Sequence, residues 1–117
     1  MRPAEDPDRF RIEASRHGEA RVLRLVGELD LSGVDQFEQT LESQLDDDGG
    51  VVALDLSGLS FMDSSGLRAL VMADLRVKET GRNLVVVRPS RPVARVMTLT
   101  DVSERLELVD EVPTGSG

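Results

Sequence analysis

The chain contains no cysteine, no tryptophan and no tyrosine, and it has a single histidine, His17. Without cysteine the protein cannot form disulfides, use a thiol as a nucleophile or hold zinc through thiolates, which fits a reducing compartment. A metal site would have to be built from carboxylates, and none of these are spaced for one. We therefore predict that the protein holds no metal and no other cofactor.

Clustered positive charge is also missing, because 14 lysine and arginine residues stand against 22 aspartate and glutamate residues, for a net charge of −8. Binding to nucleic acid or to an anionic membrane surface depends on clustered cations, so we expect neither. The first residues lack the apolar core of a signal peptide, and the apolar runs are far shorter than a membrane span. These absences predict a cytoplasmic protein whose partner presents a basic surface.

The length of 117 residues suits one domain, and the hydrophobic 39 % of the chain is enough for a modest core. Residues 1–9 are polar and contain proline, so we predict a flexible N-terminal arm there. We place the domain at residues 10–111 and a disordered tail at 112–117.

Five segments have the pattern of β-strands. Alternating apolar and charged residues over 10–14 predict a strand with one solvent-exposed face. A polar turn joins this strand to a second, antiparallel strand predicted at 21–26. The segments 51–56 and 83–87 are apolar at nearly every position, which is typical of strands covered on both faces. A short edge strand is predicted at 106–109.

Two further helices are predicted, one before and one after the central helix, and the later one is short. The first begins with a capping arrangement at 32–35, and the acidic segment 46–50 closes it. Its apolar stripe consists of Val34, Phe37, Leu41 and Leu45. The third begins with Ser90 as N-cap and Pro92 in its first turn.

The second predicted helix runs over 67–79, with Gly81 just after its end. Its core-facing side is expected to carry Leu67, Leu70, Val71 and Leu75. The complete order, β-β-α-β-α-β-α-β, predicts an α/β fold with a small mixed β-sheet and packed helices.

The most informative segment, 61–68, joins a buried strand to the second helix and places Ser64 and Ser65 beside Asp63. N–H groups at a helix start have no intrahelical partner, and with the helix dipole they accept a phosphate. Gly66 lacks a side chain, so a partner's backbone or a nucleotide phosphate can approach closely. The junction predicts a phosphorylation switch on a protein-binding module. The alternative is that one serine caps the helix and the other is solvated.

Two neighbouring features indicate a contact surface. Asp30 ends the second strand and is expected at the same sheet edge as Asp63, as part of an acidic rim around the serines; the alternative is a loop or capping carboxylate. The outer face of the second helix is expected to carry Ser65, Ala69, Met72 and Arg76. An exposed methionine suits an adaptable contact, and the alternative is an ordinary solvent-exposed face.

A different use of phosphate would involve Asp55, which lies inside a predicted strand as the phosphoacceptor of a receiver domain does. That site would also need an acidic pair and a lysine, but Glu28 and Asp30 are separated by Leu29, and Arg88 stands where the lysine would be. A structural, hydrogen-bonding aspartate is the alternative that we favour. The sequence argues against a serine hydrolase, because no G-x-S-x-G motif is present and the single histidine lies in a predicted turn far along the chain from Ser64.

Three segments together, Val26–Asp30, Leu54–Leu67 and Ser90–Met97, resemble the STAS domain of bacterial anti-sigma factor antagonists, and the resemblance covers roughly residues 10–110. It implies a STAS-like fold and a protein that is a substrate and not an enzyme. In that family the serine directly after the aspartate of D-S-[ST]-G accepts the phosphate, which here is Ser64. The implied partners are an anti-sigma factor with a GHKL-type serine kinase domain and a metal-dependent serine phosphatase.

The resemblance implies that the unmodified protein binds the anti-sigma factor and frees a sigma factor, and that a phosphate on Ser64 abolishes this binding. Many members carry glycine where this chain has Arg68, a departure that could alter partner choice. The expected contact surface consists of Asp30, Asp63, Ser65, Gly66, Arg68, Ala69, Met72 and Arg76. The alternative is a non-phosphorylated STAS scaffold in a lipid-transport or stress-sensing assembly.

Overall fold

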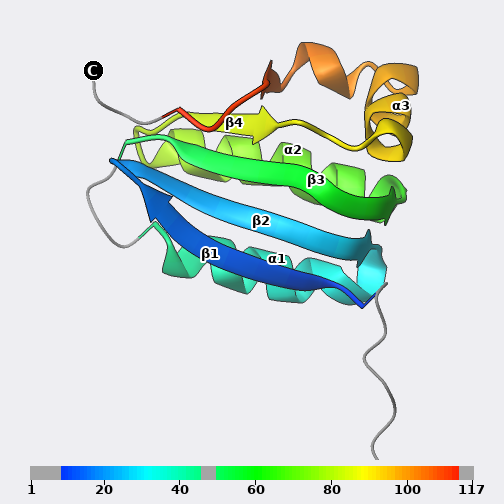
Figure 1. Cartoon of the computed structure of the whole chain (residues 1–117), viewed down its shortest axis with the longest axis horizontal. Helices are drawn as coiled ribbons and strands as arrows, with labels where there is room; N and C mark the ends of the chain where they lie inside the picture. The colour runs from blue at the N-terminus through cyan, green and yellow to red at the C-terminus, as the bar shows by residue number, and fades with distance from the viewer. Residues whose placement is uncertain (1–8, 46–49, 114–117) are drawn as a thin grey trace, which may run out of the picture.

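The computed structural model describes residues 9–45 and 50–113, and Figure 1 shows them as one mixed sheet with helices packed against it. The sheet has the order β1-β2-β3-β4-β5; β1 is antiparallel to β2, and the other neighbours are parallel. The strands are β1 (Arg11–His17), β2 (Ala20–Leu29), β3 (Val52–Met62), β4 (Leu84–Val87) and β5 (Glu107–Val109). The predicted α/β class and element order are confirmed, with one added 3₁₀ turn, η1 (Val102–Glu104).

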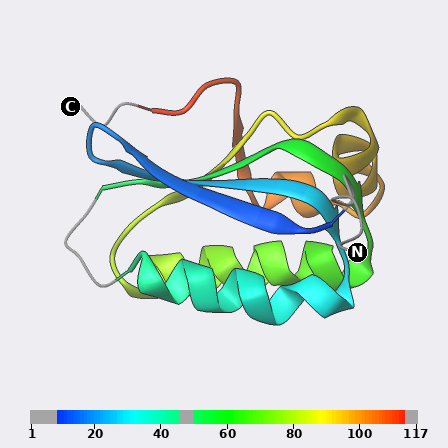
Figure 2. The same ribbon diagram turned by 60° about the horizontal axis from the view of Figure 1, so that its bottom comes forward.

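Three helices accompany the sheet: α1 (Leu31–Ser43), α2 (Ser64–Glu79) and α3 (Arg91–Leu99). Figure 2 shows α1 and α2 side by side on one face of the sheet, whereas α3 lies at the end of the sheet and contacts β3. Both α1 and α2 start where a parallel strand ends and run back over the sheet, so they point the same way. None of the helices in the described part of the chain is long and apolar enough to cross a membrane.

The main core lies between the sheet and the α1–α2 layer. Successive residues of a strand point to opposite faces, and alternate residues of β2 and β3, such as Leu23, Leu25, Leu54 and Leu56, are fully buried in it. A second cluster on the opposite side of the strands consists of Val22, Ala53, Val85 and Val87. The central strands are therefore buried on both faces, as their sequence predicts.

Val112 packs against this second cluster after β5 has ended. We expected a disordered tail from 112 onward, and at Val112 the described chain instead contacts the helix-free face of the sheet. Residues 114–117, like most of the expected N-terminal arm and of the acidic 46–50 segment, lie outside the described residues.

The strand β3 is longer than predicted. We expected it to end at residue 56, yet it continues to Met62, because Leu59 and Met62 are buried and the extra length pairs with β2. The pairing shifts register on either side of Gly27, whose φ of 95° is one that glycine adopts without strain. This extension brings the end of β3 level with the end of β2.

The rotational setting of α2 differs from the prediction. Leu67 and Leu70 are buried as expected, but Leu75 is 52 % exposed, and Asp74 takes the inward position beside it. The buried Asp74 carboxylate pairs with Lys78 Nζ at 2.8 Å, so its charge is matched within the helix. The prediction that Leu75 faces the core is therefore wrong.

The helix ends also correct the sequence analysis. The cap of α1 is Asp30, one residue before the helix, and not the predicted 32–35 arrangement. Ser90 occupies the N-cap position of α3, but its hydroxyl donates to the Leu59 carbonyl oxygen instead of capping. Gly81 has a φ of 79° and follows α2 as predicted, with its N–H bonded to the Lys78 carbonyl.

Two leucines on α2 provide a test of this setting. Leu70→Ala leaves a cavity in the core and should lower the free energy of unfolding by about 2–5 kcal/mol. Leu75→Ala removes the same atoms from solvent and should change it by no more than about 0.5 kcal/mol. Urea unfolding of both variants measures the difference, and equal losses would show that Leu75 is a core residue after all.

Candidate functional site at the ends of β2 and β3

The parallel strands β2 and β3 end side by side. Leu29 pairs with Met62 in the sheet register, and the N–H of Asp63 donates to the Leu29 carbonyl oxygen at 3.3 Å. Asp30 and Asp63 directly follow these residues, so the prediction that both lie at one edge of the sheet is confirmed. Each aspartate begins one of the two parallel helices.

Asp30 is the N-cap of α1. Its Oδ1 accepts hydrogen bonds from the Ser32 hydroxyl at 2.6 Å and from the Ser32 N–H at 3.0 Å. These bonds, the side-chain one first, lower the pKa of Asp30, because each stabilises the ionised carboxylate. The capping alternative for Asp30 is thus what the structure shows.

Asp63 plays the same part for α2. Its Oδ1 accepts hydrogen bonds from the N–H groups of Ser65 at 2.9 Å and Gly66 at 3.1 Å. The alternative in which a serine caps this helix is therefore wrong. Two of the helix-start N–H groups that we expected to be available to a phosphate are already occupied by this carboxylate, and the helix dipole remains.

The two serines differ in access. Ser64 is the first residue of α2, it is exposed, and its hydroxyl makes no hydrogen bond with any other residue in 9–45 or 50–113. Ser65 is half-buried. A kinase could approach the Ser64 oxygen without displacing an internal hydrogen bond, and Ser64 stays the predicted phosphate acceptor.

Gly66 is buried, and its missing side chain serves internal packing. A Cβ atom built there would lie 2.6 Å from the Leu29 carbonyl oxygen and 2.7 Å from Met62 Cγ. The space is filled by the ends of β2 and β3, so our expectation that a partner or a nucleotide approaches Gly66 closely is wrong. Glycine is required because the first turn of α2 lies directly on the ends of the two strands.

The outer face of α2 is only partly as predicted. Arg68 is exposed and Met72 is 49 % exposed, but Ala69 is 5 % exposed, and the prediction that it lies on the outer face is wrong. The reason is that α1 packs against this side of α2. A shallow groove of about 190 Å³ between the helices has Ala69 and Phe37 among its lining residues.

Arg76, predicted as a partner contact, is engaged within the protein. It forms a two-bond ion pair with Glu42 of α1, with Nε to Oε2 at 2.6 Å and Nη2 to Oε1 at 2.8 Å. The hydrogen bond from Arg76 lowers the pKa of Glu42, and the same bond raises the pKa of Arg76. A partner that used Arg76 would have to compete with this pair.

Two large apolar residues near this edge are exposed and were not predicted as part of the site. Leu31, the first residue of α1, is 74 % exposed, and Phe61, near the end of β3, is 45 % exposed. Leu31 directly follows Asp30, and Phe61 lies two residues before Asp63, so both add exposed apolar area near the edge aspartates. Their closeness in the sequence to these two aspartates was the signal that could have predicted them.

Asp55 does not have the surroundings of a receiver phosphoacceptor. It is the fourth residue of the 11-residue strand β3, far from the carboxyl end of that strand. The Asp55 Oδ1 accepts two hydrogen bonds from Ser57, one from the backbone N–H at 2.9 Å and one from the side-chain hydroxyl at 2.7 Å. The structural role that we favoured agrees with this geometry. Across the described ranges, no group of three or more histidine, aspartate or glutamate side chains could hold a metal ion.

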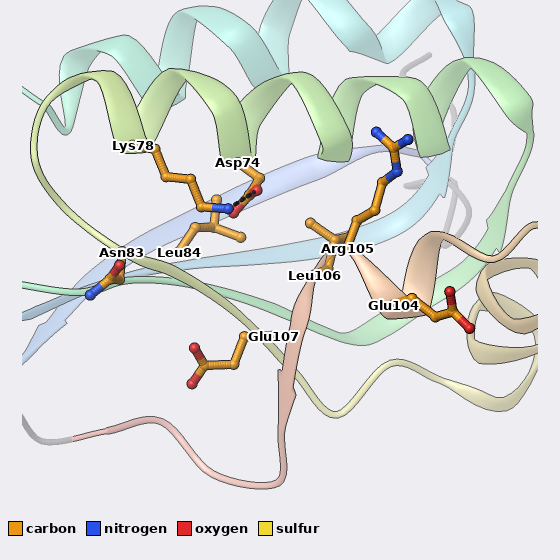
Figure 3. A pocket seen from close by; sticks show the side chains of 8 residues that line it. All are labelled: Asp74, Lys78, Asn83, Leu84, Glu104, Arg105, Leu106 and Glu107. Carbon is orange, nitrogen blue, oxygen red and sulfur yellow. Dashed lines mark ion pairs between the residues drawn. The ribbon is translucent and has the colours of Figure 1, made fainter.

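A second, more polar pocket of about 280 Å³ lies between α2 and the η1–β5 segment (Figure 3). Asp74 and Lys78 form one wall, and Arg105 and Glu107 lie across from them. Asp74 is ten residues along α2 from Ser64, nearly three helical turns away. This pocket is therefore separate from the edge that carries the serines.

The chain belongs to the STAS domain family, because the family model described as "Mlab, STAS domain" matches residues 12–110. Among curated relatives, the chain is similar to an anti-sigma-B factor antagonist of Staphylococcus epidermidis, with 25 % identity over 97 residues that cover 83 % of this chain and 90 % of the relative. It is also similar to the anti-sigma-F factor antagonist RsfB of Mycobacterium tuberculosis, with 28 % identity over 90 residues and 74 % of each chain.

Solved structures share the fold. An anti-sigma factor antagonist from Mycobacterium paratuberculosis matches with a TM-score of 0.80 and 24 % identity, over 93 % of this chain and 92 % of the other. SpoIIAA in its unphosphorylated form matches with a TM-score of 0.68 and 26 % identity, over 89 % of both chains. The phosphorylated form of the Bacillus protein SpoIIAA matches with a TM-score of 0.64 and 24 % identity, over 89 % of this chain and 92 % of the other.

The packing at Gly66 gives a first test of the site. Gly66→Ala should lower the free energy of unfolding by about 1–3 kcal/mol, since the new methyl group meets a backbone oxygen that cannot move freely. Gly50→Ala is the matched control, because the nearest atom to its new methyl group would be 3.6 Å away. Chemical denaturation measures both variants, and a stable Gly66→Ala protein would rule out the close approach.

The cap at Asp63 gives a second test. Asp63→Ala should destabilise the protein by about 1 kcal/mol, because two N–H groups lose their acceptor. Asp63→Asn keeps an acceptor oxygen and should lose less. Asp35→Ala, which removes an exposed charge from α1, controls for net charge. Thermal unfolding distinguishes them, and equal melting temperatures for Asp63→Ala and Asp35→Ala would contradict the capping role.

Proposed function

We propose that this protein is an anti-sigma factor antagonist controlled by phosphorylation of Ser64. In the proposal, the unmodified protein binds an anti-sigma factor in the cytoplasm and thereby frees a sigma factor. The observation that carries the proposal is the exposed Ser64 hydroxyl at the shared end of β2 and β3, within the segment that resembles the family's phosphorylation motif. The names of the curated relatives and the two solved forms of SpoIIAA support it.

The protein acts as a substrate in this scheme and not as an enzyme. The anti-sigma factor supplies ATP through a GHKL-type kinase domain. The Ser64 oxygen attacks the γ-phosphorus, the bond between the β- and γ-phosphates breaks, ADP leaves, and the hydroxyl proton passes to a base of the partner. A serine phosphatase removes the phosphate by hydrolysis and restores the hydroxyl.

The contact surface follows from what is exposed at the edge. Ser64, Arg68 and Met72 are accessible on α2, and Leu31 at the start of α1 and Phe61 near the end of β3 add exposed apolar area. Asp30, Asp63 and Ser65 would be contacted as parts of the two capped helix starts. Such an edge combines exposed apolar and charged groups, which suits a protein partner better than a small ligand.

A phosphate on Ser64 would block this contact by charge and bulk. It adds about −2 charge to the acidic edge that carries Asp30 and Asp63, and it would face any carboxylate of the partner that lies against Ser64; like charges set against each other across an interface cost several kcal/mol. A penalty of about 3 kcal/mol weakens binding roughly a hundredfold, since each 1.4 kcal/mol is tenfold. The helix N-terminus tolerates the added anion, so the modified protein should stay folded.

The second candidate is a non-phosphorylated STAS scaffold in a lipid-transport or stress-sensing assembly. The matching family description, which names Mlab and not an antagonist, is the observation that favours it. A scaffold would take up no phosphate from any serine kinase of the antagonist class.

Substitutions at the two serines separate these candidates. With ATP and a candidate anti-sigma kinase, the unaltered chain and Ser65→Ala should gain one phosphate by intact mass, whereas Ser64→Ala should gain none and still bind the kinase. Ser64→Asp should bind more weakly, although less so than the phosphorylated protein, because a carboxylate carries less charge than a phosphate. Full phosphorylation of Ser64→Ala would show that another residue is the acceptor.

A further inference from the structure

Arg68 is an exposed cation of α2. It makes no hydrogen bond and no ion pair with any residue of the described ranges 9–45 and 50–113. The other two cations of the helix are engaged, Arg76 with Glu42 and Lys78 with Asp74. The unpaired guanidinium lies one helical turn after Ser64.

The spacing of Ser64 and Arg68 favours a contact between their side chains. Residues four apart on an α-helix are neighbours on its surface, and their side chains lean toward the helix N-terminus. A side chain at position 68 can therefore reach over the turn that begins with Ser64. An anion on the N-terminal side of a cation is the favourable order for such a pair.

A phosphate on Ser64 would find few other groups to neutralise it. The N–H groups of Ser65 and Gly66 are already bonded to the Asp63 carboxylate. The charged residues at the ends of β2 and β3, namely Glu28, Asp30 and Asp63, are all acidic and would repel it, and the cations Arg91 and Arg95 belong to α3, which contacts β3. Arg68 is the cation that the spacing of α2 places within reach.

We propose that Arg68 binds the phosphate of phosphorylated Ser64 through bidentate, charge-assisted hydrogen bonds. This inference rests on the proposed function, because it concerns the modified form of the same switch. Its consequence is that modification both adds an anion to the contact surface and withdraws a cation from it. A partner that pairs an acidic side chain with Arg68 in the unmodified protein would lose that contact at the same moment.

The test uses protein with phosphoserine placed at position 64 by chemical synthesis, so that no kinase is needed. Phosphorus NMR follows the second ionisation of the phosphate, which is near pH 6 in free phosphoserine. A guanidinium close by stabilises the dianion, so it lowers this pKa, and Arg68→Gln should raise the titration midpoint by about 0.3 pH unit. The shift should shrink in 1 M salt, where the Debye length is about 3 Å.

Two further variants serve as controls. Arg68→Gln combined with Met72→Arg keeps the net charge but places the guanidinium eight residues from Ser64, and it should titrate like Arg68→Gln alone. Arg68→Lys keeps the positive charge but lacks the planar guanidinium that can donate two hydrogen bonds to one phosphate, so its titration midpoint should be intermediate. The Arg68 Nε–H signal should also exchange more slowly with water in the phosphorylated protein than in the unmodified one.

The same midpoint for the original sequence and for Arg68→Gln would overturn the inference, and so would a restored midpoint in the Met72→Arg variant. Either result would leave the proposed switch standing, because partner binding by the two forms is measured separately. Failure of any kinase to modify Ser64 would instead count against the switch and would leave the titration result unaffected.

Discussion

The contact of the first turn of α2 with the ends of β2 and β3 is the constraint on which the site depends. Because Gly66 has no Cβ, the turn can lie on the Leu29 carbonyl and the Met62 side chain. Asp63 is then held by a backbone hydrogen bond to the end of β2, and Ser64, the next residue, begins α2 in an exposed position. The packing of Gly66 thus fixes the helix turn on which the exposed serine lies.

Much of the fold could be predicted from local sequence. Segments that are apolar at nearly every position indicated the central strands, which are buried on both faces. The D-S-S-G junction indicated that a helix starts after one of these strands. The position of Asp30 beside Asp63 also followed, because parallel strands place their carboxyl ends at one edge. What could not be predicted was the extension of β3, since the serines and glycine of 57–60 are typical of a loop until their pairing with β2 is known.

Two of the errors on α2, at Ala69 and Arg76, share one physical cause. A helix that packs only on a sheet has a single apolar stripe, but α2 contacts both the sheet and α1, so its buried surface wraps further around the helix. Ala69 is buried by that second contact, and Arg76 finds Glu42 across the helix pair. Neither neighbour can be inferred from the sequence of α2 alone, and a buried Asp74 paired within its own helix is no easier to foresee.

The parallel arrangement of α1 and α2 has an electrostatic consequence for the edge. Two helix dipoles with the same orientation bring about half a positive charge each to the place where Asp30 and Asp63 lie. These partial charges offset part of the charge on the two carboxylates, and the guanidinium of Arg68 adds one full positive charge a helical turn further along α2. An arriving dianion would outweigh that single cation, so an approaching molecule would meet a predominantly negative surface where it had met one of mixed charge.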